Sequence, residues 1–262
     1  MRVRLFPLAL AAAAGLTVAF LTLPVVALFT HGSPGRLLDA LAEPSSRQAL
    51  WLSLETSGIA IAIVVLVGTP AAWVLATVPF PGRGLVVTLV ELPLVLPPAV
   101  AGLALLVAFG PEGMVGEPLG DAGVVLPFHT AAVVVALVFV SAPFHIRQAQ
   151  AAFAALDPSL LEASRTLGAS PARTFLRVAV PSVAGALVTG AALALARALG
   201  EFGATLMFAG SLEGVTRTAS LAVYDRFGVD LDGALALSAV LVGLAAILLV
   251  AVKLAGERVA AR

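Results

Sequence analysis

Six long apolar segments set the main constraint on how this chain can fold. A helix rises about 1.5 Å per residue, so roughly 20 apolar residues are needed to cross about 30 Å of hydrocarbon. The segments that reach this length are 7–30, 50–78, 85–109, 124–144, 179–208 and 233–254. The chain is 60% apolar and 11% charged, against roughly 25% charged residues in an average soluble domain. The sequence therefore predicts an all-α membrane protein with six transmembrane helices, in a single transmembrane domain over residues 1–262.

The first segment has one alternative interpretation. MRVR followed by AAAAG could form a secretory signal with a cleavage site. The apolar run continues through LTVAFLTLPVVALF, well past a usual signal core, and this favours a transmembrane helix. If the segment were cleaved, five spans would remain and the new N-terminus would lie outside.

Composition excludes several kinds of site. The formal net charge is zero, so we expect no nucleic-acid partner, and without cysteine there is no thiolate chemistry and no disulfide. The lysine at 253 lies in VAVKLAG, without the glycine frame of a phosphate-binding loop. We expect no metal site, no catalytic residue and no cofactor in this chain. If ATP drives its activity, another chain must bind the ATP and Mg²⁺.

Basic residues predict the orientation. With the N-terminus in the cytoplasm, more basic residues fall on the inner side than on the outer side, as the positive-inside rule requires. The inner residues are Arg2, Arg4, Arg83, Arg147, Arg165, Arg173, Arg177, Lys253, Arg258 and Arg262, and the outer residues are Arg36, Arg47, Arg217 and Arg226. The sequence predicts a multi-pass protein of the cell inner membrane with both termini in the cytoplasm.

The long inner loop, residues 145–178, contains clear helix signals. Asp157 is a good N-cap, Pro158 fits the first helical position, and Gly168 can take the left-handed conformation that ends a helix. We expect a helix over 158–167, and a second one that Ser170 and Pro171 start and that ends near residue 177.

The first of these helices carries an apolar stripe. Leu160, Leu161, Ser164 and Leu167 fall on one side by the 3.6-residue period, and Glu162 and Arg165 are displaced from it. Such a stripe needs a cover, either the inner ends of the protein's own spans or a partner protein.

The stretch LEASRTLGASPARTFLRVAVP resembles the E-A-A signature of ABC importer permeases, with Ser164 in place of the second alanine. The resemblance implies that the loop docks in a groove on an ATPase subunit. The residues implied in docking are Asp157, Leu160, Leu161, Glu162, Ala163, Ser164, Leu167, Gly168, Ala169 and Pro171.

Further blocks, from about residue 50 to 249, resemble the molybdate permease subfamily. They include ELPLVLPPAVAGLALL, ALARALGEFGATLMFAG and RTASLAVYD, in the same order. The resemblance implies import of a tetrahedral oxyanion such as molybdate, with sulfate, thiosulfate or tungstate as alternatives. It also implies a homodimer, two ABC ATPase subunits that bind ATP and Mg²⁺, and an external oxyanion-binding protein. Ala209, Gly210 and Ser211 depart from the AGN usual in that subfamily.

The ionisable residues within the predicted spans include Glu55, Glu91, Arg197 and Glu201. Such residues usually face a bundle interior, a partner charge or water. Arg197 and Glu201 lie four residues apart near the outer boundary, so on an unbroken helix they can pair. Alternatively, Arg197 adds positive potential to an oxyanion route. Glu201 would repel a dianion, so we do not expect it to be a direct ligand.

Prolines and glycines mark a candidate pathway or gate. Pro93, Pro97 and Pro98 predict a kinked or interrupted third span, which serves either packing or a gate wall. Gly200 and Gly203 permit close backbone approach or a helix break. The candidate pathway or gate residues are Pro97, Pro98, Arg197, Glu201, Gly203 and Thr205. We interpret His129 and His145, which flank the fourth span, as interface residues.

Two other function classes remain open at this stage. A self-contained channel or ion-coupled transporter would need an ion site inside the bundle, yet no charge lies securely at mid-membrane. An intramembrane enzyme would need a motif such as H-E-x-x-H, and the sequence has none.

Overall fold

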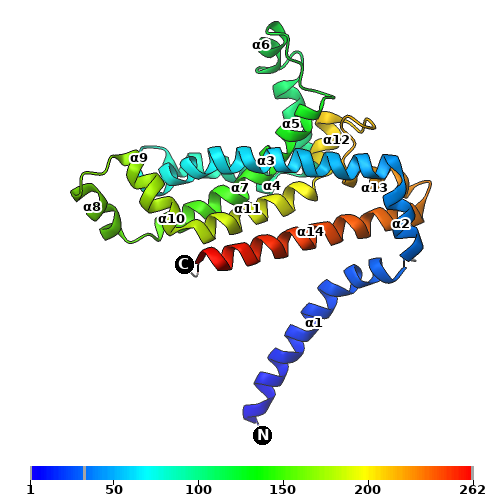
Figure 1. Ribbon diagram of the computed structural model, residues 1–262, viewed down its shortest axis with the longest axis horizontal. Coiled ribbons are helices and arrows are strands. Elements are labelled where there is room, and N and C mark those ends of the chain that lie inside the picture. The colour runs from blue at the N-terminus through cyan, green and yellow to red at the C-terminus, as the bar shows by residue number, and fades with distance from the viewer. Residues whose placement is uncertain (1, 32–33, 261–262) are drawn as a thin grey trace.

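The computed structural model describes residues 2–31 and 34–260 as an assembly of helices (Figure 1). Arg262, counted above among the inner basic residues, lies outside the described residues. The helices of the first half are α1 Arg2–His31, α2 Pro34–Ala42, α3 Pro44–Thr77, α4 Arg83–Val95, α5 Pro98–Phe109, α6 Gly116–Asp121 and α7 Thr130–Ala154. Those of the second half are α8 Pro158–Thr166, α9 Pro171–Thr174, the π-helix η1 Phe175–Ala179, α10 Val180–Ser182, α11 Ala184–Leu199, α12 Gly203–Ala209, α13 Ala219–Phe227 and α14 Leu231–Ala260.

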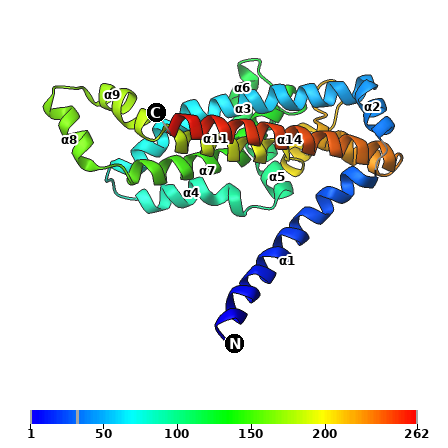
Figure 2. The ribbon, with the colours of Figure 1, turned by 60° about the horizontal axis from the view of Figure 1, so that its bottom comes forward.

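Helices α3, α7, α11 and α14 form the bundle and run side by side in both ribbon views (Figures 1 and 2). Alanines occupy the contacts, among them Ala60 in α3, Ala136 in α7 and Ala194 in α11, each with an exposed fraction of 0%. Apolar lipid gives no hydrophobic drive for helices to associate, so small residues that permit close backbone approach stabilise such a bundle.

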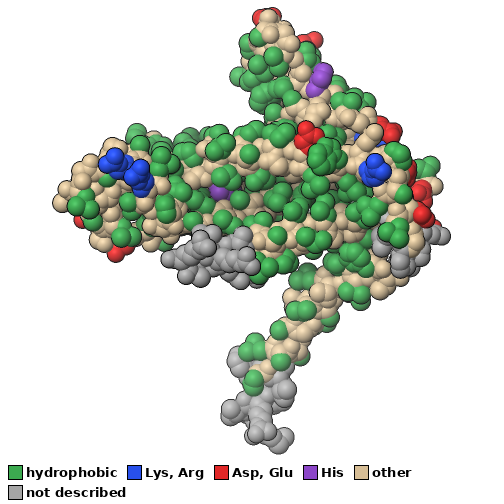
Figure 3. Space-filling model, in the orientation of Figure 1, with side chains coloured by type: hydrophobic (Ala, Val, Ile, Leu, Met, Phe, Trp, Pro, Cys, Tyr) green, Lys and Arg blue, Asp and Glu red, His purple; other side chains and the backbone are tan. Residues whose placement is uncertain are grey.

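Two ends of the bundle can be distinguished. One end carries α8, α9 and α10, and we call it the docking end after the prediction made for this loop. The opposite end, here the α13 end, carries α2 and α13 (Figure 1). Figure 3 shows hydrophobic side chains along the length of the bundle and charged side chains mainly towards its ends. This distribution suits a molecule whose middle lies in hydrocarbon.

Membrane-crossing length is met by four helical segments among the described residues: Ala9–Thr30, Pro44–Thr77, Thr130–Ala154 and Leu231–Val252. Two bent pairs raise the number to as many as six. One joins α4 to α5 with a bend of 118°, and the other joins Pro171–Ser182 to α11 with a bend of 75°. The structure thus has four to six candidate spans, and the six-span topology stays a prediction.

The fourth apolar segment shows how a helix can differ from its apolar run. Helix α7 begins at Thr130 and ends at Ala154, both later than the predicted 124–144. Residues 124–129 are not helical: Pro127 lies there, and Phe128 has a φ of 63°, which is rare for a residue with a side chain.

Helix α1 and the α5–α6 segment leave the bundle. Helix α1 extends away from the body at the α13 end in both views (Figures 1 and 2), and α5 and α6 project from the long axis in Figure 1. Within the described chain, none of the best apolar window of α1 is buried. Lipid or another protein must therefore cover this helix.

Candidate functional site

The loop at the docking end contains the predicted helix signals, although α9 ends at Thr174 and the chain continues as the π-helix η1. Asp157 precedes α8, and its carboxylate accepts a 2.9 Å hydrogen bond from the backbone N–H of Ser159. Hydrogen bonds from the Ser159 backbone N–H and hydroxyl lower the pKa of the Asp157 carboxyl. Gly168 has a φ of +78°, and Ser170 accepts a hydrogen bond from the N–H of Arg173 to start α9. The cap, the glycine turn and the second start are confirmed.

The apolar stripe on α8 is divided between two surroundings. Leu160 and Leu167 are 47% and 88% exposed, whereas Leu161 packs on the apolar cluster around Phe153 and Ser164 is only 8% exposed. The protein itself therefore covers the stripe at Leu161 and Ser164, and Leu160 and Leu167 stay open to a partner. Of the other predicted docking residues, Asp157, Glu162, Ala163, Gly168 and Pro171 are exposed, and Ala169 is half-buried.

Three aromatic side chains anchor this loop to the bundle. Trp73 of α3 meets Phe153 of α7 edge to face, with ring centroids 5.2 Å apart, and Phe175 of η1 lies 5.7 Å from Trp73 and 6.2 Å from Phe153. Pairs at such separations add attraction beyond area burial. A displacement of the loop would therefore disturb α3 and α7 through these rings, as well as α11, which follows the loop in the chain.

The third predicted span is interrupted, as its prolines predict. Leu96 is extended with φ −67° and ψ 132°, Pro97 is the N-cap of α5, and Pro98 is its first residue. A residue before proline avoids the helical region, which explains why α4 ends here.

The fifth predicted span is also interrupted, and its far part packs on α5. A Cβ built on Gly102 of α5 would lie 2.6 Å from the carbonyl oxygen of Ala204. A Cβ built on Gly203 of α12 would lie 2.7 Å from Cβ of Pro98. The two breaks therefore come together, and α5 and α12 form a tightly packed pair that we call the α5–α12 unit. The glycines provide both outcomes that the sequence left open, a break and a close approach.

Arg197 and Glu201 form an ion pair at the break after α11. Helix α11 ends at Leu199, so Glu201 lies beyond an interrupted helix and not on the unbroken one considered above. The other carboxylate oxygen of Glu201 accepts a 2.7 Å hydrogen bond from the N–H of Ala204, and the residue is 2% exposed. Glu201 thus ties the end of α11 to the start of α12, and the pairing alternative is confirmed.

Thr205 lies in the same unit and is fully buried. Its hydroxyl has no hydrogen-bond partner among the described residues. The structure thus brings five predicted pathway residues, Pro97, Pro98, Glu201, Gly203 and Thr205, to the two breaks, with Arg197 paired at their edge.

Two polar contacts of α7 were not anticipated. Arg147 pairs with Glu91 of α4 at 2.7 Å. His145 is fully buried, and its Nε2 lies 2.9 Å from the hydroxyl of Thr69 in α3. The interpretation of His145 as an interface residue is wrong, because α3 and the α11 backbone at Gly190 enclose it. His129 is exposed, and its Nδ1 lies 2.9 Å from the carbonyl of Pro127.

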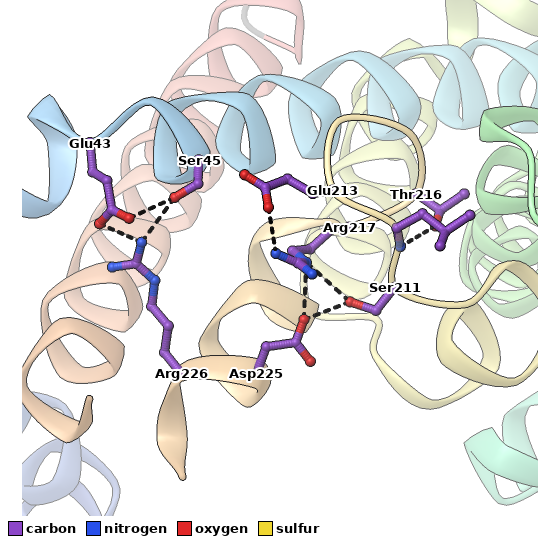
Figure 4. Close-up of polar contacts among 9 residues, drawn as sticks. Glu43, Ser45, Ser211, Glu213, Thr216, Arg217, Asp225 and Arg226 are labelled. Atoms are coloured by element: carbon purple, nitrogen blue, oxygen red, sulfur yellow. Dashed lines mark hydrogen bonds and ion pairs between the residues drawn. The ribbon is translucent and has the colours of Figure 1, made fainter. Parts of the chain in front are cut away.

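The α13 end carries an ionic network that sequence reasoning also missed (Figure 4). Arg226 of α13 pairs with Glu43, which precedes α3, and Arg217 pairs with Asp225 at 3.0 Å and with Glu213 at 3.2 Å. The hydrogen bond from Arg226, followed by one from the Ser45 hydroxyl, lowers the pKa of the Glu43 carboxyl. The Glu43–Arg226 pair could not be predicted because the two residues lie far apart in the sequence. The four-residue spacing of Glu213 and Arg217 could have indicated their pair.

The described residues include no cluster of side chains suited to bind a metal ion. Within residues 2–31 and 34–260, no group of three or more His, Asp or Glu side chains could hold a metal ion. The arrangement offers an exposed helical loop at the docking end, two interrupted helices packed together, and a network of charges at the other end.

Comparison with known proteins identifies the family. The sequence model of the family described as "Binding-protein-dependent transport system inner membrane component" matches residues 65–260. The chain belongs to this family of ABC importer permeases. It is accordingly a membrane-spanning transport subunit and not the ATPase of the transporter.

Curated relatives include oxyanion permeases. The molybdenum transport system permease protein ModB of Mycobacterium tuberculosis is 42% identical over 239 residues, which cover 90% of this chain and 89% of that protein. ModB of Escherichia coli K12 is 40% identical over 178 residues, or 68% of this chain and 78% of that protein. The sulfate transport system permease protein CysW of a Synechocystis species is 32% identical over 245 residues, or 92% and 89%.

Solved ABC transporters share the fold. A chain of a bacterial alginate ABC transporter, in complex with its alginate pentasaccharide-bound periplasmic protein, has a TM-score of 0.79 at 18% identity. The match covers 98% of this chain and 96% of that one. A chain of the methionine ABC transporter MetNI in an inward-facing conformation has a TM-score of 0.60 at 22% identity, covering 81% and 94%.

Proposed function

We propose that this chain is the permease subunit of an ATP-driven importer that moves a tetrahedral oxyanion, molybdate, into the cytoplasm. The observation that carries the proposal is the 42% identity to a molybdenum permease over 90% of the chain. The overall fold supports it, because helices of spanning length form a bundle with small-residue contacts.

The exposed part of the loop at the docking end would bind the ATPase. Leu160 and Leu167 present apolar surface there, and Glu162 and Ala163 lie exposed on the same helix. ATP and Mg²⁺ would be held by the ATPase subunits. Closure of two such subunits around ATP would draw the docking helices together and tilt the bundle helices between inward-open and outward-open states.

The α5–α12 unit would form a wall of the oxyanion route. Irregular backbone at membrane depth is tolerated only where protein or a water-lined cavity covers it, and the break before α5 and the break between α11 and α12 occur here together. Glu201 would not touch the ion, because its carboxylate is occupied by Arg197 and by the Ala204 N–H. Its role would be to hold the two helices at the break in register.

Further chains would complete the transporter. We propose a second copy of this chain and two ATPases, because one chain offers one docking loop. An external oxyanion-binding protein would sit at the α13 end, opposite the docking end, since the solved alginate transporter is in complex with a periplasmic protein. Both termini would lie in the cytoplasm of a cell inner membrane.

Sulfate is the second candidate substrate. The match to CysW covers 92% of this chain, at 32% identity. Molybdate, tungstate and sulfate are all tetrahedral dianions, so fold alone does not separate them.

Uptake competition tests the substrate. The chain is co-purified with its ATPase and external binding protein and reconstituted into vesicles supplied with ATP, and the uptake of labelled molybdate is measured. We expect excess unlabelled molybdate or tungstate to suppress uptake strongly and sulfate to suppress it weakly. Strong uptake of labelled sulfate, with molybdate a poor competitor, would instead assign the complex to sulfate.

A further inference from the structure

The joint between α8 and α9, at the docking end, is a turn at Gly168. Gly168 lies in the left-handed region, and a Cβ built on it would meet nothing within 4 Å. Backbone hydrogen bonds close the turn, from Gly168 N–H to the Arg165 carbonyl and from Ala169 N–H to the Ser164 carbonyl. Within the described structure a Cβ at Gly168 would touch no neighbour, so the side-chain contact that fixes α8 against α9 lies elsewhere.

A buried pair of hydroxyls spans this joint. Ser164 Oγ of α8 lies 2.9 Å from Thr174 Oγ1 of α9, and the two residues are 8% and 3% exposed. Hydrogen bonds are directional, so this contact fixes the rotation of α8 about its axis more closely than the apolar contact of Leu161 does. A buried hydroxyl without a partner is costly, which favours keeping the pair closed.

Thr174 connects directly to the bundle. The next residue, Phe175, begins η1 and belongs to the aromatic group with Trp73 and Phe153. Beyond η1, the chain passes through α10 and the 75° bend into α11. Short π-helical stretches often mark functional sites, and this one lies between the docking loop and a bundle helix.

We propose that the Ser164–Thr174 hydrogen bond is a clip that passes movement of the docking helix to η1 and α11. Ser164 and Thr174 are then positioning residues of the transport cycle and touch neither ATP nor oxyanion. Without the clip, ATPase closure rotates α8 about the Gly168 turn, and ATP is hydrolysed without import. The inference rests on the proposed function, since it concerns how ATP hydrolysis is coupled to oxyanion uptake.

Removal of either hydroxyl tests the clip. The variants are Ser164→Ala, Thr174→Val, the double variant, and the exchange Ser164→Thr with Thr174→Ser, which keeps both hydroxyls. Thr166→Val is the matched control, because its hydroxyl bonds only the Glu162 carbonyl of its own helix among the described residues, on the exposed surface. Each is assembled with ATPase and binding protein in vesicles. Measured are ATPase association, ATP hydrolysis and molybdate uptake.

The expected result is a change in coupling. The ratio of ATP hydrolysed to molybdate imported should rise about fivefold in each single variant, the factor that corresponds to the loss of one modest contact. ATPase association should match the unchanged chain. The double variant should be no worse than the single variants because one contact is lost in all three, and the exchange and Thr166→Val should keep the original ratio.

Two results would overturn the clip. One is an unchanged ratio in both single variants, and the other is a loss of uptake that follows a loss of ATPase association, which would place the pair in docking alone. A failure of the proposed function gives a different result, because the unchanged complex would then import neither molybdate nor another oxyanion. That result would also overturn the proposed clip, which rests on the proposed function.

Discussion

At the scale of single residues, side chains act either on their neighbours in the sequence or on partners from other helices. Asp157 and Gly168 act through their immediate neighbours, so their types and spacing were sufficient to predict the cap and the turn. Partners distant in sequence were hidden: His145 meets Thr69, and Glu91 meets Arg147. Nothing in local spacing indicates such pairs, since only helix packing brings them together.

The Arg197–Glu201 pair should contribute measurably to stability. Glu201→Ala removes the ion pair and the bond from the Ala204 N–H, and Arg197, at 27% side-chain exposure, is partly screened. We expect the free energy of unfolding in mixed micelles to fall by about 3 kcal/mol, the lower end for breaking a buried pair.

Two variants serve as controls for this pair. Glu201→Gln, which keeps an acceptor for Ala204, should lose less stability. Glu213→Ala, which breaks the more exposed pair with Arg217, should cost less than about 1 kcal/mol. Equal losses in Glu201→Ala and Glu213→Ala would show that burial of Glu201 adds nothing.

Glu43 should make stability depend on pH at the α13 end. Its pKa lies below the usual 4.5, so its bond to Arg226 stabilises the fold above that value and is lost as the pH falls through the lower folded value. Glu43→Gln should therefore lower the Tm of the purified chain at neutral pH and have no effect once wild-type Glu43 is protonated. A Tm difference that persists unchanged in acid would contradict the assignment of the effect to this carboxylate.

Elements were predicted where their signals are local and strong. Prolines predicted the end of α4, and the caps predicted α8. The start of α7 was misplaced because the apolar run through residues 124–129 contains Pro127 and a left-handed Phe128. The contact between α5 and α12 could not be predicted from local sequence. Gly102 of α5 is needed because it packs against α12, and Gly203 of α12 is needed because it packs against α5.

Close packing of the α5–α12 unit predicts the effect of one methyl group. In Gly102→Ala the new Cβ would meet the Ala204 carbonyl at 2.6 Å and Met207 Cβ at 2.7 Å, so the helices must separate. Overpacking of this kind costs about 1–3 kcal/mol. We expect a lower Tm and weaker uptake.

Gly58→Ala is the matched control for Gly102→Ala. Gly58 is a glycine inside α3 with nothing within 4 Å of the added Cβ, and the same change there should be neutral or stabilise by up to about 1 kcal/mol. If Gly102→Ala behaved like Gly58→Ala, the unit would not be tightly packed.

At the scale of the whole molecule, composition and apolar length predicted the class of protein, and the resemblance around Glu162 predicted the family. The arrangement of the helices was not predictable, because apolar segments specify crossing and not neighbours. Exposed α1 and the projecting α5–α6 segment leave apolar surface outside the bundle. A second copy of the chain would cover part of this surface in the proposed transporter.

ATP-driven accumulation of molybdate in vesicles tests the central claim most directly. The complete complex should accumulate molybdate only when ATP is supplied. Gly168→Asp, which forces a side chain into the left-handed turn, should reduce ATPase association and uptake together, whereas Gly120→Asp, at another open glycine without positive φ, should leave both unchanged. Accumulation without ATP, or full association and uptake with Gly168→Asp, would contradict an ATPase-coupled permease that docks through this loop.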